Sequence, residues 1–126
     1  MLPGQTHADF LALSRCCDIF LDAPGWSGGR TTLEAIACGL LPMTLAGSLM
    51  RQRHTAAILS ELGLHTLIAH NADNYVRQAA RLGNDTALRQ QLTQDLASRK
   101  SVLLKRHDVI QALLAFCETS RHKSVG

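Results

Sequence analysis

The chain has 126 residues, of which 46% are hydrophobic and 18% are charged, and its formal net charge is +3. This composition is typical of one globular domain and excludes a disordered chain. No apolar run approaches the roughly twenty residues of a membrane span, and the first ten residues lack the basic start and apolar run of a signal peptide, so we expect a cytoplasmic protein with no membrane partner.

The predicted elements alternate between short apolar strands and helices up to residue 69, and only helices follow. Alternation with short connections predicts a parallel sheet covered by helices on both faces. Because three strands make a thin sheet, the predicted fold class is α/β: a partial Rossmann-like domain with a short parallel sheet followed by C-terminal helices. In chain order, the sequence first predicts a helix from Thr6 to Arg15, a strand over Ile19–Leu21, a helix opened by Thr31-Thr32 and closed by Gly39, and a strand over Leu40–Leu45. A helix through Ala56 and Leu62 and a strand over Thr66–Ala69 follow. Asn71 is the predicted cap of a helix through Tyr75 and Leu82, and Asp85 is the predicted cap of a helix through Leu88 and Leu96. A final helix is predicted from about Lys105, with one side formed by Val109, Ile110, Leu113, Leu114 and Cys117.

One residue does not suit this sheet. Pro42 lies inside the second predicted strand, which would be central if the three strands pair in chain order. A proline in a central parallel strand removes one N–H group from the hydrogen-bond ladder. Either the strand begins at Met43, or the sheet accommodates the proline.

The loop after the first strand is the predicted functional site. It carries Gly28 and Gly29 and leads into the helix that opens near Thr31. The first N–H groups of a helix have no partner within it, and the helix dipole places partial positive charge there. Glycines let a ligand approach closely, threonine hydroxyls can donate to phosphate, and Arg30 adds a charge. Glu34, one turn further, could accept hydrogen bonds from sugar hydroxyls, so the segment suits a nucleotide with a diphosphate and a ribose.

The same segment also has a purely structural interpretation. The spacing Thr31-x-x-Glu34 is that of a capping box, in which each side chain satisfies an unpaired N–H group at the helix start. Gly28-Gly29 can be no more than a tight turn, and the segment matches neither GxGxxG nor a Walker loop. Residue chemistry alone leaves both interpretations open.

Other partner classes receive little support. Positive charge is concentrated after residue 85, as expected for a solvated helix face, and no basic patch is interleaved with aromatic residues, so we predict no nucleic-acid partner. The four cysteines and six histidines lack zinc-ligand spacing, so we predict no metal site.

The quoted segments resemble a known family. DIFLDAPGWSGGRTTLEAIACG, then TLAG, Arg53 and ELGLHTLIAHNADNYVRQAARLGND look like the C-terminal part of the O-linked N-acetylglucosamine transferase and SPINDLY-type glycosyltransferases. The resemblance extends from about Thr6 to Glu118. It implies a GT-B architecture, in which two Rossmann-like domains face each other and the C-terminal one binds the nucleotide sugar. This chain would supply the C-terminal half of that fold, with residues 1–104 as an incomplete nucleotide-sugar-binding region and residues 105–126 as its last helix and a frayed tail.

The resemblance also implies which residues bind the donor. The loop and helix start would hold the UDP diphosphate, and Glu34 would bind the ribose. Arg53 would lie near the donor or serve a structural role. The implied donor-binding residues are Ser27, Gly28, Gly29, Arg30, Thr31, Thr32, Glu34 and Arg53. No catalytic residue is assigned, and the implied donor is a UDP-sugar used without a cofactor or metal.

The expected function follows from this resemblance. The chain would be the donor-binding region of a glycosyltransferase that moves N-acetylglucosamine from UDP to a protein acceptor. It departs from the family at Phe10, where a histidine is common, and at Leu41, where the proline of a GxP motif is expected. The family's upstream repeats and N-terminal half have no counterpart here, so we expect a missing N-terminal half or a partner chain, and no activity of the chain alone. The alternative is a stand-alone or degenerate nucleotide-binding or interaction module.

Overall fold

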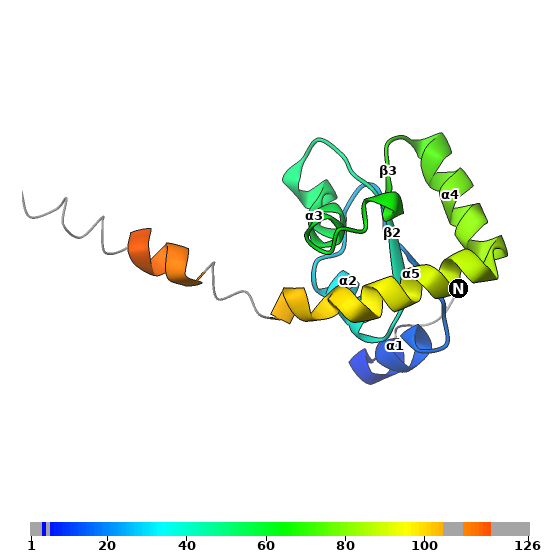
Figure 1. Cartoon of the computed structure of the whole chain (residues 1–126), viewed down its shortest axis with the longest axis horizontal. Helices are drawn as coiled ribbons and strands as arrows, with labels where there is room; N and C mark the ends of the chain where they lie inside the picture. The colour runs from blue at the N-terminus through cyan, green and yellow to red at the C-terminus, as the bar shows by residue number, and fades with distance from the viewer. Residues whose placement is uncertain (1–3, 5, 105–109, 117–126) are drawn as a thin grey trace, which may run out of the picture.

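The computed structural model describes residues 4, 6–104 and 110–116. It is a mixed α/β fold with three short strands and helices on either side of the central strand in the view of Figure 1. The predicted fold class is therefore confirmed. The elements are α1 (His7–Ser14), β1 (Ile19–Leu21), α2 (Arg30–Ala37), β2 (Leu41–Leu45), the 3₁₀ turn η1 (Met50–Gln52), α3 (His54–Glu61), η2 (His65–Leu67), β3 (Ile68–Ala69), α4 (Ala72–Asn84), α5 (Thr86–Arg99) and η3 (Lys100–Leu104).

The strands pair in the order β1-β2-β3, and both pairs are parallel. Leu21 lies opposite Met43, and Thr44 lies opposite Ile68. Because the strands are parallel, their carboxyl ends meet at one edge of the sheet, and the loop after β1 leaves from that edge. The third strand is shorter than predicted, since residues 65–67 form the turn η2 instead.

Pro42 lies within β2, so the suggestion that this strand begins at Met43 is wrong. The Leu41 N–H donates to Asp18 and the Met43 carbonyl accepts from Asp22, so these two residues of β2 face β1. The backbone hydrogen-bonding groups of successive residues in a strand point to alternate neighbours, so those of Pro42 point toward β3. There β3 begins only opposite Thr44, and the N–H group that proline lacks would therefore have had no strand partner.

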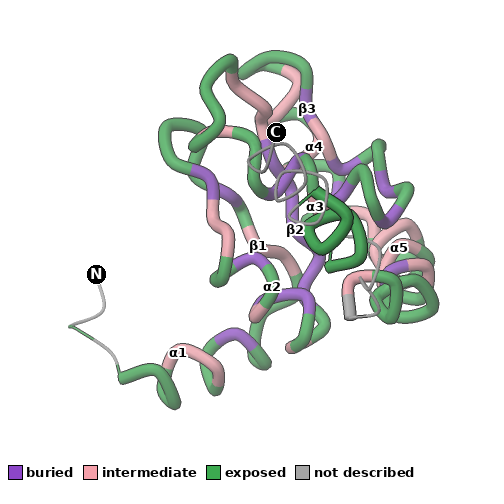
Figure 2. The backbone as a smooth tube through the Cα atoms, turned by 90° about the vertical axis from the view of Figure 1, so that its left-hand side faces the viewer, coloured by how far each residue is buried: buried purple, intermediate pink, exposed green. Residues whose placement is uncertain are grey.

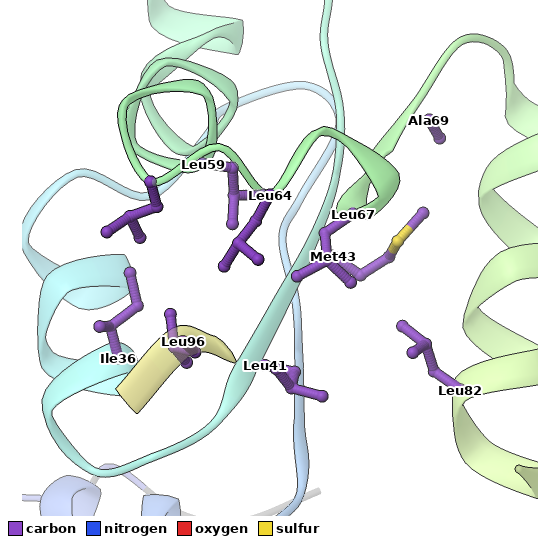
Figure 3. Packing of buried hydrophobic residues seen from close by; sticks show 10 residues of the cluster. Ile36, Leu41, Met43, Leu59, Leu64, Leu67, Ala69, Leu82 and Leu96 are labelled. Carbon is purple, nitrogen blue, oxygen red and sulfur yellow. The ribbon is translucent and has the colours of Figure 1, made fainter. Parts of the chain in front are cut away.

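The core gathers around β2, which is buried from Leu41 to Thr44. Leu41 and Met43 pack with Ile36 of α2, Leu59 of α3 and side chains of the later helices (Figure 3). From α5, Leu96 packs into this core; it is 1% exposed and is the one buried residue of that helix. Burial of these aliphatic side chains is the main stabilising term of the domain.

Polar side chains cap the starts of α4 and α5 where the sequence predicts them. Asn71 accepts a hydrogen bond from the Asn74 N–H at the start of α4, and Asp85 accepts one from the Leu88 N–H at the start of α5. Gly39 follows α2 with a positive φ of 90°, a conformation that favours glycine. The breaks between the predicted helices are therefore confirmed.

The last described segment, residues 110–116, is helical, as predicted. Its apolar side chains do not contribute to the core: Ile110, Leu113 and Leu114 are each more than half exposed. Val109, Cys117 and the predicted start near Lys105 lie outside the described residues. Within the described part of the chain, no helix combines the length and the apolar character that crossing a bilayer would require.

Candidate functional site

A buried carboxylate organises the loop after β1. Asp22 follows β1 directly and is 2% exposed. Its Oδ1 accepts a hydrogen bond from the Gly28 N–H at 2.7 Å. Its Oδ2 accepts from the Ser27 hydroxyl and from the Thr44 hydroxyl of β2, each at 2.7 Å. Hydrogen bonds to an ionised acceptor are stronger than neutral ones, so Asp22 fixes the loop to the sheet edge.

A second set of hydrogen bonds joins the starts of α2 and α3. The Gly28 carbonyl accepts from the Thr32 hydroxyl at 2.7 Å and from the Thr55 hydroxyl at 3.1 Å. The Thr55 N–H donates to the Ser27 hydroxyl at 2.9 Å. Thr32 and Thr55 are both fully buried. Two helix N-termini, each with partial positive charge, are thereby held beside the same loop.

The predicted donor-binding residues divide into two groups. Ser27 and Thr32 are buried, and their hydroxyls belong to the network just described. Gly28 and Gly29 are half-buried, whereas Arg30, Thr31 and Arg53 are exposed. The loop therefore offers its backbone and the first residues of α2 to solvent, while two of the predicted hydroxyls point inward.

The capping-box interpretation of Thr31 and Glu34 is wrong. Gly29 is the N-cap of α2, and no side chain caps the helix. The first hydrogen bond of α2 runs from the Leu33 N–H to the Gly29 carbonyl at 3.2 Å. The N–H groups of residues 30–32 precede this bond and have no acceptor within the helix. Such an end is suited to binding an anion.

Glu34 lies one turn into α2 and contacts two basic side chains. Its Oε1 accepts a hydrogen bond from Arg30 Nε at 2.6 Å and lies 3.7 Å from Nε2 of His7 in α1. The Glu34 side chain is 18% exposed, whereas those of Arg30 and His7 are 78% and 55% exposed. The carboxylate therefore carries its charge in a partly enclosed position beside the start of α2.

The start of α3 borders a hollow of about 450 Å³ next to this site. Its lining includes Ser48, Met50, Arg53, His54 and Ala57. His54 is close to α2 as well, since a Cβ built on Gly29 would lie 3.5 Å from its Nδ1. Arg53 is the N-cap of α3, and the starts of α3 and α2 therefore lie near each other. In the described part of the chain, no group of three or more His, Cys, Asp or Glu residues could hold a metal ion.

Several residues that lie at this site were not among the predicted site residues. Trp26 is 72% exposed in the loop, and the Arg51 guanidinium lies 5.8 Å from the centroid of its ring. The hydroxyl of Tyr75 in α4 donates a hydrogen bond to the backbone carbonyl of Asp22 at 2.9 Å. Burial, and then the charge of Asp22, raise the pKa of the Tyr75 phenol, so this donor keeps its proton at neutral pH. A polar residue directly after a short apolar strand was the one sequence signal for Asp22.

The closeness of Gly28 to α2 gives a first prediction. A Cβ at position 28 would lie 2.5 Å from Thr31 Oγ1 and 2.8 Å from Thr32 Oγ1. The exposed Thr31 can rotate away, but Thr32 is buried and hydrogen-bonded. Gly28→Ala is therefore expected to lower the free energy of unfolding by about 1–3 kcal/mol, measured by urea denaturation. Gly25→Ala is the control, because a Cβ there meets no atom within 4 Å. Equal stability of the two variants would contradict the packing described for Gly28.

Comparison with known proteins finds a matching family and similar proteins. The model of Glycosyl transferase family 41 matches residues 6–112. An Arabidopsis thaliana protein described as "Probable UDP-N-acetylglucosamine--peptide N-acetylglucosaminyltransferase SPINDLY" is 38% identical over 72 residues, which are 56% of this chain and 8% of that protein. A Solanum lycopersicum protein with the same description is 35% identical over 68 residues, or 54% of this chain and 7% of that protein. A solved mutant of the Thermobaculum terrenum O-GlcNAc transferase superposes with a TM-score of 0.79 at 30% identity, covering 93% of this chain and 23% of that chain.

Proposed function

The chain belongs to glycosyl transferase family 41, and we propose that it is the donor-binding C-terminal region of a glycosyltransferase. The observation that carries the proposal is the uncapped start of α2 at the carboxyl edge of the sheet, where open α/β sheets bind their ligands. The two similar plant proteins are described as UDP-N-acetylglucosamine–peptide transferases. We therefore propose a UDP-sugar, with N-acetylglucosamine as the sugar, as donor and a protein as acceptor.

The diphosphate would bind at the start of α2. The N–H groups of residues 30–32 and the exposed Thr31 hydroxyl would donate to phosphate oxygens, and Arg30 would add positive charge. Gly28 and Gly29 would allow the close approach. In this proposal Ser27 and Thr32 act indirectly, because their hydroxyls already hold the loop in shape.

The ribose would lie over Glu34, one turn along α2. Arg30 and His7 both contact Oε1 of this carboxylate, so Oε2 would be the acceptor for a ribose hydroxyl. Arg53, at the N-cap of α3, and the dipole of that helix would add positive charge beside the donor. The hollow beside them would accommodate part of the donor.

The chemical contribution of this site would be to stabilise the leaving group. Transfer of the sugar breaks the bond to UDP, and negative charge develops on the diphosphate. Preorganised N–H groups and a cation at that position lower the energy of the transition state. The chain spans 23% of the similar solved transferase. We therefore propose that a partner segment binds the acceptor and supplies the domain that faces this one. This chain alone would then not turn over the donor.

A titration of UDP tests the proposed site. Thr31→Val removes one hydroxyl without changing side-chain shape, and Glu34→Ala removes the carboxylate. Each loses a hydrogen bond in which one partner is charged, so the Kd for UDP is expected to rise roughly tenfold. The measurement is isothermal titration calorimetry on the full chain.

Thr86→Val is the matched control, since Thr86 is exposed at the start of α5. It is expected to bind UDP as the unmodified chain does. Equal Kd values for Thr31→Val, Glu34→Ala and this control would place any nucleotide elsewhere. No response to millimolar UDP would favour the alternative, a degenerate interaction module.

A further inference from the structure

Helix α1 reaches the proposed donor site through its first residue. His7 Nε2 lies 3.7 Å from Glu34 Oε1, although the two residues belong to different helices. Helices α1 and α2 lie side by side (Figure 2), and the Cys38 thiol approaches the Leu11 carbonyl at 3.9 Å further along the pair. The proposed ribose-binding carboxylate is thus contacted from outside its own helix.

A capping box stabilises the start of α1, where this histidine lies. Thr6 and Asp9 form a reciprocal capping box: the Asp9 N–H donates to the Thr6 hydroxyl, and the Thr6 N–H donates to the Asp9 carboxylate, each at 3.2 Å. The Thr6 hydroxyl also donates to that carboxylate at 2.6 Å. Hydrogen bonds from the Thr6 side chain, and then from its backbone, lower the pKa of Asp9, which stays ionised at neutral pH. His7 therefore begins a capped helix beside α2.

We propose that His7 is a positioning residue of the donor site, which together with Arg30 holds Oε1 of Glu34 and leaves Oε2 to accept a ribose hydroxyl. This inference rests on the proposed function. In the described part of the chain, the basic side chains that contact Glu34 are Arg30 from its own helix and His7 from α1. Asp9 is the other charged group at the start of α1, and its carboxylate is bound to Thr6.

The consequence is a pH dependence of donor binding. Arginine keeps its charge at every pH of interest, whereas histidine side chains gain theirs as the pH falls through the neutral range. A protonated imidazole attracts the Glu34 carboxylate and adds positive charge near the diphosphate, and both effects favour the donor. Because the pair is partly exposed, donor affinity is expected to rise about twofold to fivefold between about pH 8 and pH 6.

The test is the pH profile of UDP-N-acetylglucosamine binding to the full chain, measured by calorimetry. This probe is chosen because its diphosphate is esterified at both ends and does not titrate near neutral pH. His7→Gln keeps a polar side chain that cannot gain charge, and the twofold to fivefold rise should disappear. His65→Gln is the control, because His65 is exposed before β3, at the opposite end of the sheet, and the rise should persist there.

The outcomes separate the two proposals. Loss of the rise in His7→Gln but not in His65→Gln supports the positioning role. The same rise in His7→Gln as in the unmodified chain overturns it and leaves the proposed donor site standing. Absence of binding at every pH overturns both.

Discussion

Asp22→Ala is expected to lower the free energy of unfolding by about 3–5 kcal/mol, which is a large share of the roughly 5–15 kcal/mol of a typical domain. The buried carboxylate accepts three hydrogen bonds, from the Gly28 N–H and from the Ser27 and Thr44 hydroxyls. Removing it leaves the buried Ser27 and Thr44 hydroxyls and the half-buried Gly28 N–H without their acceptor. Urea denaturation at neutral pH, followed by circular dichroism, measures the change.

Asp18→Ala is the matched control for this variant. Asp18 is exposed just before β1, and its removal is expected to change the free energy of unfolding by no more than about 0.5 kcal/mol. Asp22→Asn provides a finer test, because the amide keeps the shape of the side chain but turns one acceptor into a donor. Asp22→Ala as stable as Asp18→Ala would mean that the carboxylate does not hold the loop.

Leu96→Ala is expected to lower the free energy of unfolding by about 2–5 kcal/mol. Leu96 is the one buried residue of α5 and packs into the cluster around Leu41 and Met43. Truncation leaves a cavity where α5 meets the sheet, so the amides of α5 are expected to lose hydrogen-exchange protection first. Leu33→Ala is the comparison, since Leu33 is 45% exposed. Similar losses for the two variants would show that α5 is not anchored at Leu96.

Much of the fold could be predicted from the sequence because local patterns agree with the final packing. Short apolar runs bounded by glycine and polar residues predict the strands, and Asn71 and Asp85 predict where helices begin. The doubt over Pro42 arose from a rule about central strands that assumes a full ladder on both sides. The sequence could not show that β3 pairs only from Thr44 onward, because strand length depends on tertiary contacts.

The sequence indicated where the loop before α2 lies, but not the contacts within it. Glycines before a helix predict such a loop, but they do not reveal which residue caps that helix. Gly29 is the cap, and the Thr31-x-x-Glu34 pattern is therefore not used. Asp22 and Thr55 were missed because their partners are far apart in the chain and meet only when α3 packs beside the loop. The same holds for His7, which meets Glu34 only through the packing of α1 against α2.

Mapping UDP on the chain by amide chemical shifts would show whether the uncapped start of α2 binds the diphosphate of a UDP-sugar. We expect the largest shifts on the amides of residues 29–32, with smaller ones at Arg53 and His54. Residues of the separate hollow between α4 and α5, such as Gln78 and Arg81, would stay unchanged. Shifts centred on that second hollow, with residues 29–32 unaffected at saturating UDP, would contradict the claim.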